Sequence, residues 1–519
     1  MAVDYSLYLV TDSTRQILGD ADLVRVVDEA IKGGVTIVQY RDKQNDTREL
    51  IRVATQLHAV TRRHHVPLLI NDRVDVALAV GCEGVHIGQD DMDLQLARKI
   101  LGDKAIIGVT ASSVDEAVAA VEAGADYLGL GTVFATPTKE NTKSIIGTAG
   151  LRSILTSLAT LSRSVPTVCI GGINADTIQR VVYQGSPKTK PLDGVAVVSA
   201  IVAARDPEQA ARLLRRRLAE PPAFAAQINL TPSQDLGELL ARVGSIAQRV
   251  AQQKPLCHNM TNLVVQNFAA NVALAIGGSP IMSSNGLEAR DLASLGGSLV
   301  LNMGTVTPES LKNYLLAMAA YNATGNPILF DPVGGGATSI RREAIATLMS
   351  SGYFDVIKGN TSEILTVLGE QRVAQRGVDS TPNSGFTAED KARAVKRLAQ
   401  RERNIVIMTG ATDYISDGIR VFAISNGHEY LGSITGSGCT LGTTIAAFAA
   451  VERGDRLLAA LAAILIYEIA AEQATQRHDV QGTGTFMAAF LDQLYAIRAQ
   501  SLKGDFDWVA AAKVEHIHI

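Results

Sequence analysis

Eight short runs of apolar, β-prone residues recur in the first 204 residues, and a stretch with helical spacing of apolar residues follows each of them. Strands that alternate with helices form parallel sheets, and eight such units can close a sheet into a barrel. The first part of the chain is therefore predicted to fold as a (β/α)8 TIM barrel. Its strands are expected to begin near Tyr5, Val35, Pro67, Gly84, Ala105, Tyr127, Thr167 and Gly194.

The chain is too long for this barrel alone, because it has 519 residues and single-domain barrels reach about 250. After the eighth unit the composition shifts to proline, glutamine and charged residues. Beyond that shift, alanine-lined helical stretches alternate with strands that end in glycine, which predicts an open α/β/α sandwich. We expect a barrel in residues 1–220, a linker in 221–235 and a second α/β domain in 236–519.

The net charge and the cysteines indicate which partners the protein can bind and which cellular compartment it suits. The net charge is −4 and the cations are scattered, so no footprint for nucleic acid or an anionic membrane is evident. The four cysteines have no CxxC spacing, which indicates reduced thiols. A first strand at Tyr5 leaves no room for a leader, and the apolar stretch Leu457–Tyr467 is too short to cross a bilayer. We expect a cytoplasmic enzyme that acts on small molecules, with a buried helix at Leu457–Tyr467.

Polar side chains follow the second, third and fourth predicted strands. Arg41 and Lys43 close the second strand, Asp72 closes the third and Asp91 follows the fourth. The reactive groups of such barrels lie where strands end, and Mg²⁺ is commonly held by one or two carboxylates plus phosphate oxygens. These residues predict a site for magnesium and a diphosphate, whereas His86 is expected to be structural. The alternative is that the aspartates cap the helices that follow them.

Three later loops predict anion binding at the same end of the barrel. The loop after the sixth strand brings glycine amides, two hydroxyls and an ammonium group together, and the seventh strand ends in two glycines. Barrels often bind phosphate at the last loops through exposed backbone N–H groups and a helix N-terminus. The barrel mouth is therefore expected to hold two anions. The residues concerned are Thr136, Thr138, Lys139, Gly172, Val198 and Ser199.

Taken in order, these motifs resemble those of thiamine-phosphate synthase: QYRDK (39–43), NDRVDVALAVGCEGVHIGQDD (71–91), GLGTVFATPTK (129–139), IGGI (170–173) and VVSAI (197–201). The resemblance implies a reaction that joins a pyrimidine methyl diphosphate to a thiazole phosphate and releases pyrophosphate. It implies that Arg41 and Lys139 are catalytic and that Asp72 and Asp91 bind Mg²⁺. The diphosphate would be bound by Gln39, Arg41, Lys43, Asn71, Thr110 and Lys139, and the thiazole phosphate by Thr136, Thr138, Gly172, Val198 and Ser199. Thr110 replaces a serine that is common in the family and keeps its hydroxyl.

The second half has no G-x-x-x-x-G-K-[ST] phosphate loop. Its candidate phosphate site is GSITGSGCT (432–440), because glycines before a helix leave backbone N–H groups facing an oxyanion. Cys439 lies at the expected helix start, where the pKa of a thiol tends to fall; alternatively it is a small core residue. Asp331 and Glu363 each follow a strand beside glycine and are candidates for sharing Mg²⁺.

The 432–440 run and five further motifs resemble hydroxyethylthiazole kinase, of the ribokinase-like superfamily: NMTN (259–262), GGSPIM (277–282), FDPVGGGAT (330–338), IKGNTSE (357–363) and VIMTG (406–410). The resemblance implies phosphorylation of a hydroxyethyl-methylthiazole by ATP. Met282 and Gly436 would contact the thiazole, and Lys358 and Thr409 the nucleotide. Cys439 would occupy the position of the catalytic base, which most ribokinase relatives fill with aspartate. Lys358 stands where many members have arginine, and it lacks the two-pronged phosphate contact of arginine.

Together the two resemblances imply a bifunctional enzyme of thiamine biosynthesis, with Mg²⁺ as the expected cofactor. The second half would make thiazole phosphate, and the barrel would convert it to thiamine monophosphate. Two alternatives stay open: the same folds acting on other small alcohols and diphosphates, or one half acting as a non-catalytic ligand-sensing module. The kinase resemblance also implies trimers, paired into hexamers in fused relatives. The two histidines of the C-terminal tail, His516 and His518, are expected to be surface residues.

Overall fold

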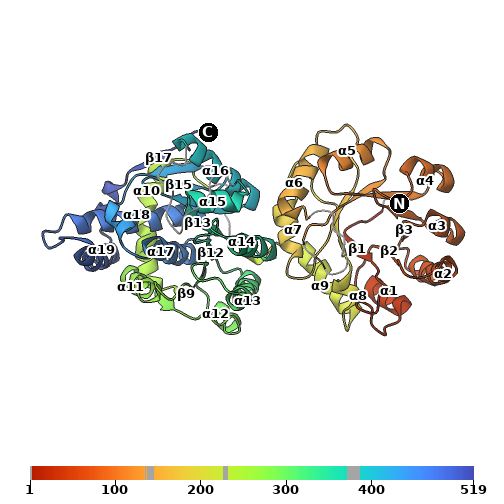
Figure 1. Cartoon of the computed structure of the whole chain (residues 1–519), viewed down its shortest axis with the longest axis horizontal. Helices are drawn as coiled ribbons and strands as arrows, with labels where there is room; N and C mark the ends of the chain where they lie inside the picture. The colour runs from red at the N-terminus through yellow and green to blue at the C-terminus, as the bar shows by residue number, and fades with distance from the viewer. Residues whose placement is uncertain (1–2, 135, 137–144, 226–231, 371–385) are drawn as a thin grey trace. The chain divides into compact units, whose positions relative to one another are not determined.

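The computed structural model describes residues 3–519 except 135, 137–144, 226–231 and 371–385. The chain divides into two compact units, one ending at Pro222 and the other beginning at Ala223 (Figure 1). The fold class is as predicted: a (β/α)8 barrel followed by an α/β/α sandwich.

The first unit is a closed barrel of eight parallel strands in chain order, surrounded by helices (Figure 1). Every strand begins within two residues of its predicted start. The strands are β1 (Leu7–Val10), β2 (Ile37–Tyr40), β3 (Leu68–Asn71), β4 (Gly84–Ile87), β5 (Ile106–Ala111), β6 (Tyr127–Gly131), β7 (Thr167–Ile170) and β8 (Gly194–Val197). The helices are α1 (Leu23–Lys32), α2 (Thr47–Arg63), α3 (Val74–Val80), α4 (Leu94–Leu101), α5 (Val114–Glu122), α6 (Gly147–Leu158), α7 (Ile178–Gly185), α8 (Ser199–Val202) and α9 (Pro207–Ala219).

Side-chain alternation along the strands separates two apolar layers in the barrel. On β1, Leu7 and Leu9 belong to the layer under the helices, whereas Tyr8 and Val10 belong to the inner layer. Successive strand residues point to opposite faces, so one strand contributes side chains to both layers. The inner layer also contains two further tyrosines, Tyr5 and Tyr127. The carboxyl ends of all eight strands meet at one mouth, where the polar residues singled out in the sequence follow them.

The second unit contains a nine-stranded sheet in the order β10-β9-β11-β12-β13-β14-β15-β16-β17. Strands β10 to β14 are parallel, and β15 to β17 pair antiparallel at one side. The strands are β9 (Leu256–Met260), β10 (Ser279–Ile281), β11 (Ser298–Asn302), β12 (Ile328–Asp331), β13 (Val356–Asn360), β14 (Ile405–Thr409), β15 (Asp413–Ser416), β16 (Val421–Ile424) and β17 (Val514–His516).

Helices cover both faces of this sheet (Figure 1). Strand β12 shows why: Leu329 packs into one apolar layer, and Ile328 and Phe330 pack into the other. One face carries α10 (Leu236–Gln253), α11 (Gln266–Ile276), α17 (Ser437–Val451), α18 (Arg456–Thr475) and α19 (Thr483–Leu502). The other carries α12 (Ala289–Ser294), α13 (Pro308–Thr324), α14 (Ser339–Ser351), α15 (Thr361–Leu368) and α16 (Ala388–Glu402). Short 3-10 turns are η1 (Ala223–Ala225), η2 (Glu429–Ser433) and η3 (Asp507–Ala511).

Helix α18 is the buried helix expected at Leu457–Tyr467, but it is longer, with 20 residues. By length and composition it is apolar enough to cross a membrane, yet 89% of its most apolar window is buried inside the protein. It contacts α10, α17 and α19. This burial is what a core helix shows, and it accounts for the hydropathy without a bilayer.

The chain segments on either side of the sandwich core differ from the sequence expectations. Phe224, inside the predicted linker, stacks on Tyr353 with ring centroids 4.3 Å apart, so the linker begins with a turn docked on the second unit. The C-terminal tail forms β17, which pairs with β16, and the His516 ring lies 5.0 Å from that of Phe422. The expectation of two surface histidines was wrong for His516, which is half-buried, while His518 is exposed.

Candidate active sites

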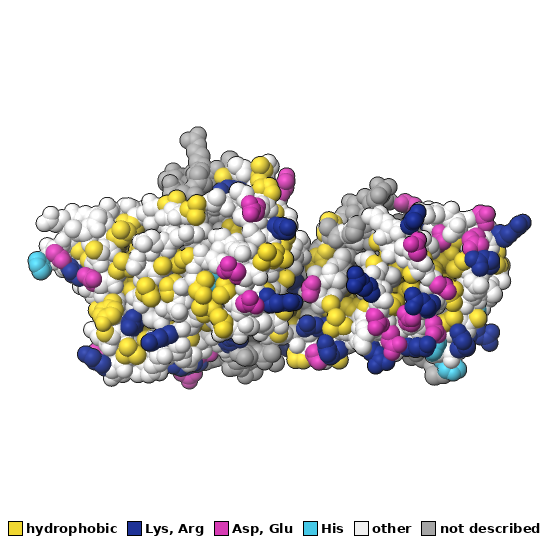
Figure 2. All heavy atoms as spheres, turned by 90° about the horizontal axis from the view of Figure 1, so that it is seen from below, with side chains coloured by type: hydrophobic (Ala, Val, Ile, Leu, Met, Phe, Trp, Pro, Cys, Tyr) yellow, Lys and Arg dark blue, Asp and Glu magenta, His cyan; other side chains and the backbone are white. Residues whose placement is uncertain are grey.

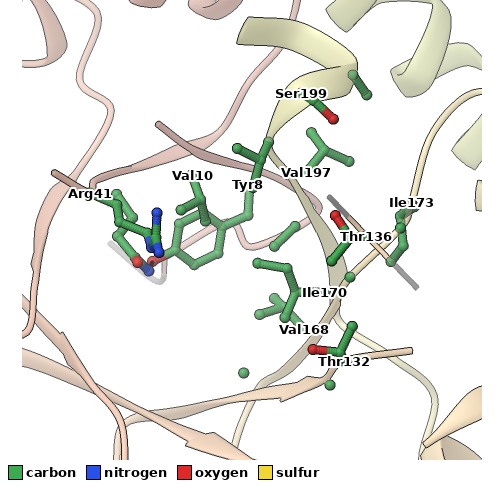
Figure 3. Close-up of a pocket in the computed structure, with 18 of the residues that line it drawn as sticks. Tyr8, Val10, Arg41, Thr132, Thr136, Val168, Ile170, Ile173, Val197 and Ser199 are labelled. Carbon is green, nitrogen blue, oxygen red and sulfur yellow. Dashed lines mark hydrogen bonds between the residues drawn. The ribbon is translucent and has the colours of Figure 1, made fainter. Parts of the chain in front are cut away.

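A cavity of about 390 Å³ opens at the carboxyl ends of the barrel strands (Figure 3). In Figure 3, Arg41 lies on one side of the view and Thr136 and Ser199 lie on the other. The cavity thus brings together residues that the sequence assigned to two different anions. Eight of the predicted site residues line it: Gln39, Arg41, Asn71, Thr110, Thr136, Gly172, Val198 and Ser199. Thr138 and Lys139 lie outside the described residues.

Three further predicted residues form a charged cluster that does not line the cavity itself. Lys43 forms an ion pair with Asp72, which adopts the left-handed backbone conformation with φ of 60°. Partial burial and then the neighbouring Asp72 carboxylate raise the pKa of Asp91. The two acids therefore lie close enough to repel one another, and Lys43 compensates only part of that charge.

Helix capping does not explain these two acids. The residue that precedes α3 is Arg73, which makes no side-chain cap, and α4 is capped by Asp93, whose carboxylate accepts from the N–H groups of Gln95 and Leu96. Asp91 instead accepts from Gly88 N at 2.7 Å within its own loop. Asp72 and Asp91 are thus held in the loops at the ends of β3 and β4 for a reason other than helix termination.

The Arg41 guanidinium is oriented by a residue that the sequence did not single out. Asp12, which follows β1 and is 2% exposed, accepts a hydrogen bond from Arg41 Nη1 at 3.2 Å. The other Asp12 oxygen accepts from the Thr14 backbone N–H at 2.9 Å. Because Asp12 is itself fixed, Arg41 is presented to the cavity in one orientation. The sequence could have identified Asp12, because it follows the first strand and polar residues at the ends of other strands proved to lie at the barrel mouth.

Backbone geometry shapes the opposite side of the cavity. Gly171 and Gly172 both have positive φ, at 109° and 65°. A Cβ on Gly171 would lie 2.4 Å from Thr132 Cγ2, so only glycine fits where the loop after β6 crosses the end of β7. Phe134 N donates to Gly171 O at 3.0 Å and joins the two loops. Val198 then precedes α8, whose first residue is Ser199, and both residues line the cavity.

A chain of hydrogen bonds crosses the inner layer of the barrel below the mouth. Gln39 Nε2 donates to Tyr8 Oη at 2.9 Å, and the hydroxyls of Tyr8 and Tyr127 are 2.7 Å apart. Tyr127 Oη is 2.7 Å from His86 Nδ1, and His86 Nε2 is 2.8 Å from Thr110 Oγ1. His86 and Tyr8 both line the cavity. The sequence reasoning missed Tyr8 and Tyr127 and treated His86 as structural.

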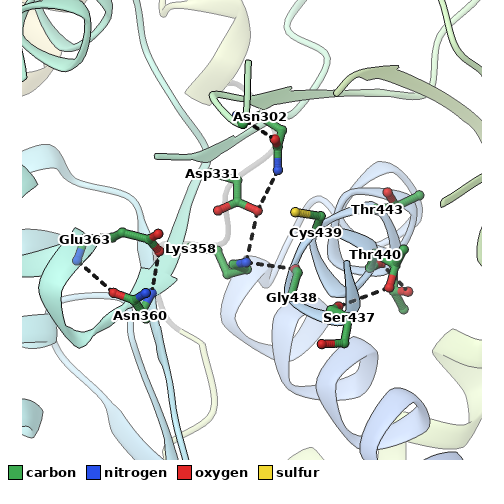
Figure 4. A network of polar contacts seen from close by, with 12 residues as sticks. Asn302, Asp331, Lys358, Asn360, Glu363, Ser437, Gly438, Cys439, Thr440 and Thr443 are labelled. Carbon is green, nitrogen blue, oxygen red and sulfur yellow. Dashed lines mark hydrogen bonds and ion pairs between the residues drawn. The ribbon is translucent and has the colours of Figure 1, made fainter. Parts of the chain in front are cut away.

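In the second unit, a polar network lies where β11, β12 and β13 meet the start of α17 (Figure 4). Asp331 Oδ2 accepts from Asn302 Nδ2 at 3.0 Å and from Lys358 Nζ at 3.0 Å. Lys358 Nζ also donates to Gly438 O at 2.8 Å. The other oxygen of Asp331, Oδ1, is buried without a hydrogen-bond partner among the described residues. A buried unpartnered carboxylate oxygen indicates a place for a ligand.

Cys439 lies in the first turn of α17, beside this network (Figure 4). Its Sγ accepts from Asn262 Nδ2 at 3.8 Å. Burial, and then the charge of Asp331, raise the pKa of the Cys439 thiol to about 11. The expectation that the helix start lowers this pKa was therefore wrong, because burial next to a carboxylate outweighs the helix-end charge. The thiol is protonated at neutral pH.

Only glycine fits at position 436. It precedes α17 with φ of 90°, and a Cβ there would lie 2.4 Å from Val265 Cγ1. The predicted residues Met282 and Thr409 lie at the carboxyl ends of β10 and β14. Asp331 lies at the carboxyl end of the parallel strand β12.

Glu363 acts as a cap in this structure. Its Oε1 accepts from Gly334 N and its Oε2 from Asn360 N, both at 2.8 Å. Burial and then Asp331 raise the pKa of Glu363 to about 7. Glu363 thus ties the glycine loop after β12 to the start of α15, while Asp331 keeps an oxygen available.

Two buried carboxyl groups, Asp413 on β15 and Glu468 on α18, are neighbours, and one oxygen of each is buried without a hydrogen-bond partner among the described residues. Burial raises the pKa of Asp413 to about 6, and burial followed by the Asp413 charge raises the pKa of Glu468 well above its usual range. Asp413 also accepts from Gly410 N at 2.9 Å, so the pair holds the turn that follows Thr409. Two such acids at close contact share one proton.

Replacing Glu468 with Gln should flatten the pH dependence of stability above about pH 5. Folding raises the pKa of this carboxyl group, so its protonated form stabilises the folded state. That contribution is complete below the unfolded-state pKa of about 4 and is lost as the pH rises through the folded-state pKa. The wild type should lose on the order of 2 kcal/mol between about pH 5 and 8, since each pKa unit corresponds to about 1.4 kcal/mol. Urea unfolding of Glu468→Gln and of the exposed control Glu429→Gln at both pH values measures this, and equal slopes for all three proteins would refute the shared proton.

Comparison with known proteins agrees with this arrangement of two sites. The family model described as thiamine monophosphate synthase matches residues 7–201, and the hydroxyethylthiazole kinase family model matches residues 247–500. The chain is 44% identical to the probable thiamine biosynthetic bifunctional enzyme of Schizosaccharomyces pombe, over 99% of each chain. It is 38% identical to the thiamine biosynthetic bifunctional enzyme of Saccharomyces cerevisiae, over 95% of this chain and 96% of that enzyme. The chain therefore belongs to the family of bifunctional thiamine biosynthetic enzymes, with a thiamine-phosphate synthase domain first and a hydroxyethylthiazole kinase domain second.

Proposed function

We propose that residues 236–519 phosphorylate 4-methyl-5-(2-hydroxyethyl)thiazole with ATP and that residues 1–220 condense the product with 4-amino-2-methyl-5-pyrimidinylmethyl diphosphate. The products of the second step are thiamine monophosphate and pyrophosphate. The observation that carries this proposal is that one cavity of the barrel is lined both by residues assigned to the pyrimidine diphosphate and by residues assigned to the thiazole phosphate.

The barrel residues suit a reaction in which a diphosphate leaves. Arg41, fixed by Asp12, and Lys43, paired with Asp72, supply positive charge where negative charge develops on the departing oxygen. Gln39, Asn71 and Thr110 line the same cavity and would orient the pyrimidine, and Lys139 completes the set in this proposal. The thiazole nitrogen carries a lone pair and needs no deprotonation, so the site needs no general base for the attack.

Mg²⁺ fits the carboxylates of both sites. Asp72 and Asp91 repel one another at the rim, and Asp331 has a buried oxygen without a partner among the described residues. No group of three His, Cys, Asp or Glu that could hold a metal alone occurs in the described part of the chain. Mg²⁺ commonly binds one or two carboxylates and completes its shell with substrate phosphates and water. When bound in this way it would neutralise phosphate charge, with Glu363 as a further ligand of the kinase site.

In the kinase half, the network positions the loop that would receive the transferred phosphoryl group. Lys358 joins Asp331 to the carbonyl of Gly438 and so fixes the turn from Gly436 to Cys439. Phosphoryl transfer depends mainly on positioning and charge neutralisation. Lys358 and Thr409 would lie beside the nucleotide, and Met282 and Gly436 beside the thiazole.

Replacing Cys439 with Ser should lower kcat for thiazole phosphorylation about 10-fold and leave the KM for the thiazole unchanged. The thiol is protonated and has only a weak contact with Asn262, so its share in the transition state is smaller than that of a charged base. Initial rates and calorimetric thiazole binding measure the two effects, with Cys82→Ser in the barrel as the control. An unchanged kcat would remove Cys439 from the mechanism.

Each half can be assayed in the intact chain without the other. Mg-ATP with hydroxyethylthiazole should give thiazole phosphate, and thiazole phosphate with the pyrimidine diphosphate should give thiamine monophosphate in the absence of ATP. Failure of the second reaction in a sample that performs the first would refute the assignment of the barrel.

The active form is proposed to be a homo-oligomer in the cytoplasm, built from trimers that pair into a hexamer. Among the described residues, 12 of the 16 exposed large hydrophobic side chains belong to the second unit, and Leu263, Val264 and Leu287 are more than 75% exposed. The face drawn in Figure 2 shows yellow side chains spread over the second unit, whereas cations and carboxylates intermingle on the first. Leu263 and Val264 directly follow Asn262, so a second subunit would cover the kinase site. All four cysteines are free, as a reducing compartment favours.

A further inference from the structure

The hydrogen-bond chain in the barrel has a direction that its own groups determine. Tyr8 and Tyr127 are 1% and 0% exposed, and burial raises the pKa of both phenols, so each hydroxyl keeps its single proton. Gln39 Nε2 donates to Tyr8 Oη. If Tyr8 then donates to Tyr127, and Tyr127 donates to His86 Nδ1, every hydroxyl donates one hydrogen bond within the chain.

The opposite direction leaves a hydrogen without an acceptor. If His86 Nδ1 donated to Tyr127 and Tyr127 donated to Tyr8, the Tyr8 oxygen would receive two donors, one from Tyr127 and one from Gln39. The Tyr8 proton would then have no acceptor among the described groups that hydrogen-bond to Tyr8 Oη. A buried donor without an acceptor costs about 1–3 kcal/mol, so the first direction is favoured.

We propose that this chain holds His86 as the tautomer protonated on Nε2 and thereby makes the Thr110 hydroxyl a hydrogen-bond donor to the pyrimidine diphosphate. His86 Nε2–H donates to Thr110 Oγ1 at 2.8 Å, which leaves the Thr110 hydrogen to point to an acceptor in the cavity. Thr110 would touch the substrate, whereas Tyr8, Tyr127 and His86 are positioning residues that act through it. This inference rests on the proposed synthase function.

This hydrogen-bond chain also explains why polar groups occupy the middle of an apolar layer. Tyr8 and Tyr127 pack with Val10, Ile37, Leu69 and Val168, where an unbonded hydroxyl would be costly. The chain satisfies both hydroxyls and connects four strands, β1, β2, β6 and β4, to Thr110 on β5. Since those strands form the barrel wall, the orientation of Thr110 is fixed before substrate enters.

The tautomer of His86 can be measured by ¹⁵N NMR on the intact chain labelled at histidine, with the signal assigned from His86→Gln. The wild type should carry its ring proton on Nε2, with Nδ1 unprotonated. Tyr127→Phe removes the donor to Nδ1 and keeps the ring that packs 4.9 Å from Tyr5 and 5.5 Å from His86. This variant should show a mixture of tautomers, and its synthase kcat should fall about 30-fold.

Tyr5→Phe is the matched control, because it removes a buried phenol hydroxyl from the neighbouring ring that has no place in the chain. It should leave the tautomer and the synthase kcat unchanged, and the kinase rate of the same chain should be unchanged in both variants. A proton on Nδ1 in the wild type, or equal synthase rates for Tyr127→Phe and Tyr5→Phe, would overturn the inference. The NMR result does not depend on turnover, so a wild type that fails to make thiamine monophosphate would refute the proposed function separately.

Discussion

Replacing Asp331 with Asn is expected to lower ATP-dependent phosphorylation of the thiazole about 100-fold or more while leaving the barrel reaction unchanged. Among the described residues, Asp331 is the only carboxylate that forms an ion pair with Lys358 Nζ, and its second oxygen is buried without a hydrogen-bond partner. Asparagine keeps the size of the side chain and removes the charge, so the loss measures charge stabilisation of the transferring phosphoryl group. Steady-state kinetics with ATP and hydroxyethylthiazole give the value.

Stability has to be separated from catalysis in this variant. Lys358 is 3% exposed, so losing its partner leaves a buried unpaired charge that destabilises the second unit. The double variant Asp331→Asn with Lys358→Met removes both charges and should recover thermal stability without recovering turnover. A kinase rate within about threefold of the wild type in folded Asp331→Asn would show that the carboxylate is not part of the site.

Replacing Asp72 with Asn should reduce kcat/KM of the synthase reaction about 100-fold or more. Asp72 has φ of 60°, a conformation that asparagine also adopts readily, so the substitution keeps the backbone and removes only the charge. Lys43 loses its partner, and Asp91 remains as the single carboxylate of the rim cluster. The measurement is the rate of thiamine monophosphate formation from thiazole phosphate and the pyrimidine diphosphate.

Asp93→Asn provides the comparison for Asp72→Asn. Asp93 caps α4, and asparagine is an equally good N-cap, so this variant loses one carboxylate near the same rim without losing its structural role. Its synthase rate should stay within about twofold of the wild type. Comparable losses in the two variants would mean that the total acidity of the rim, rather than the position of Asp72, controls the rate.

The sequence predicted the barrel strands and the mouth residues because both follow from local patterns. Apolar runs of four to six residues separated by helical stretches locate the strands, and parallel strands necessarily bring their carboxyl ends together. Residues as far apart as Gln39 and Ser199 could therefore be assigned to one cavity without coordinates. The same reasoning placed Asp331 at the end of a strand in the second half, where β12 ends.

What the sequence could not predict depends on contacts between distant elements. Alternation shows that Tyr8 points into the barrel, but which inward side chains meet depends on the relative shift of the strands, so the link from Tyr8 through Tyr127 to His86 was missed. The helix start suggested a low pKa for Cys439, and only the structure shows the burial next to Asp331 that raises it. Strand β17 has three residues and exists through its pairing with β16, which leaves no periodic signal.

The two-site account makes its most direct prediction for a mixture of two inactive proteins. Asp331→Asn and Asp72→Asn, each supplied alone with Mg-ATP, hydroxyethylthiazole and the pyrimidine diphosphate, should form almost no thiamine monophosphate. Thiazole phosphate should accumulate only with Asp72→Asn, and mixing the two folded proteins should restore thiamine monophosphate formation. A mixture that stays inactive, although Asp72→Asn makes thiazole phosphate and Asp331→Asn converts added thiazole phosphate, would contradict the assignment of one reaction to each half.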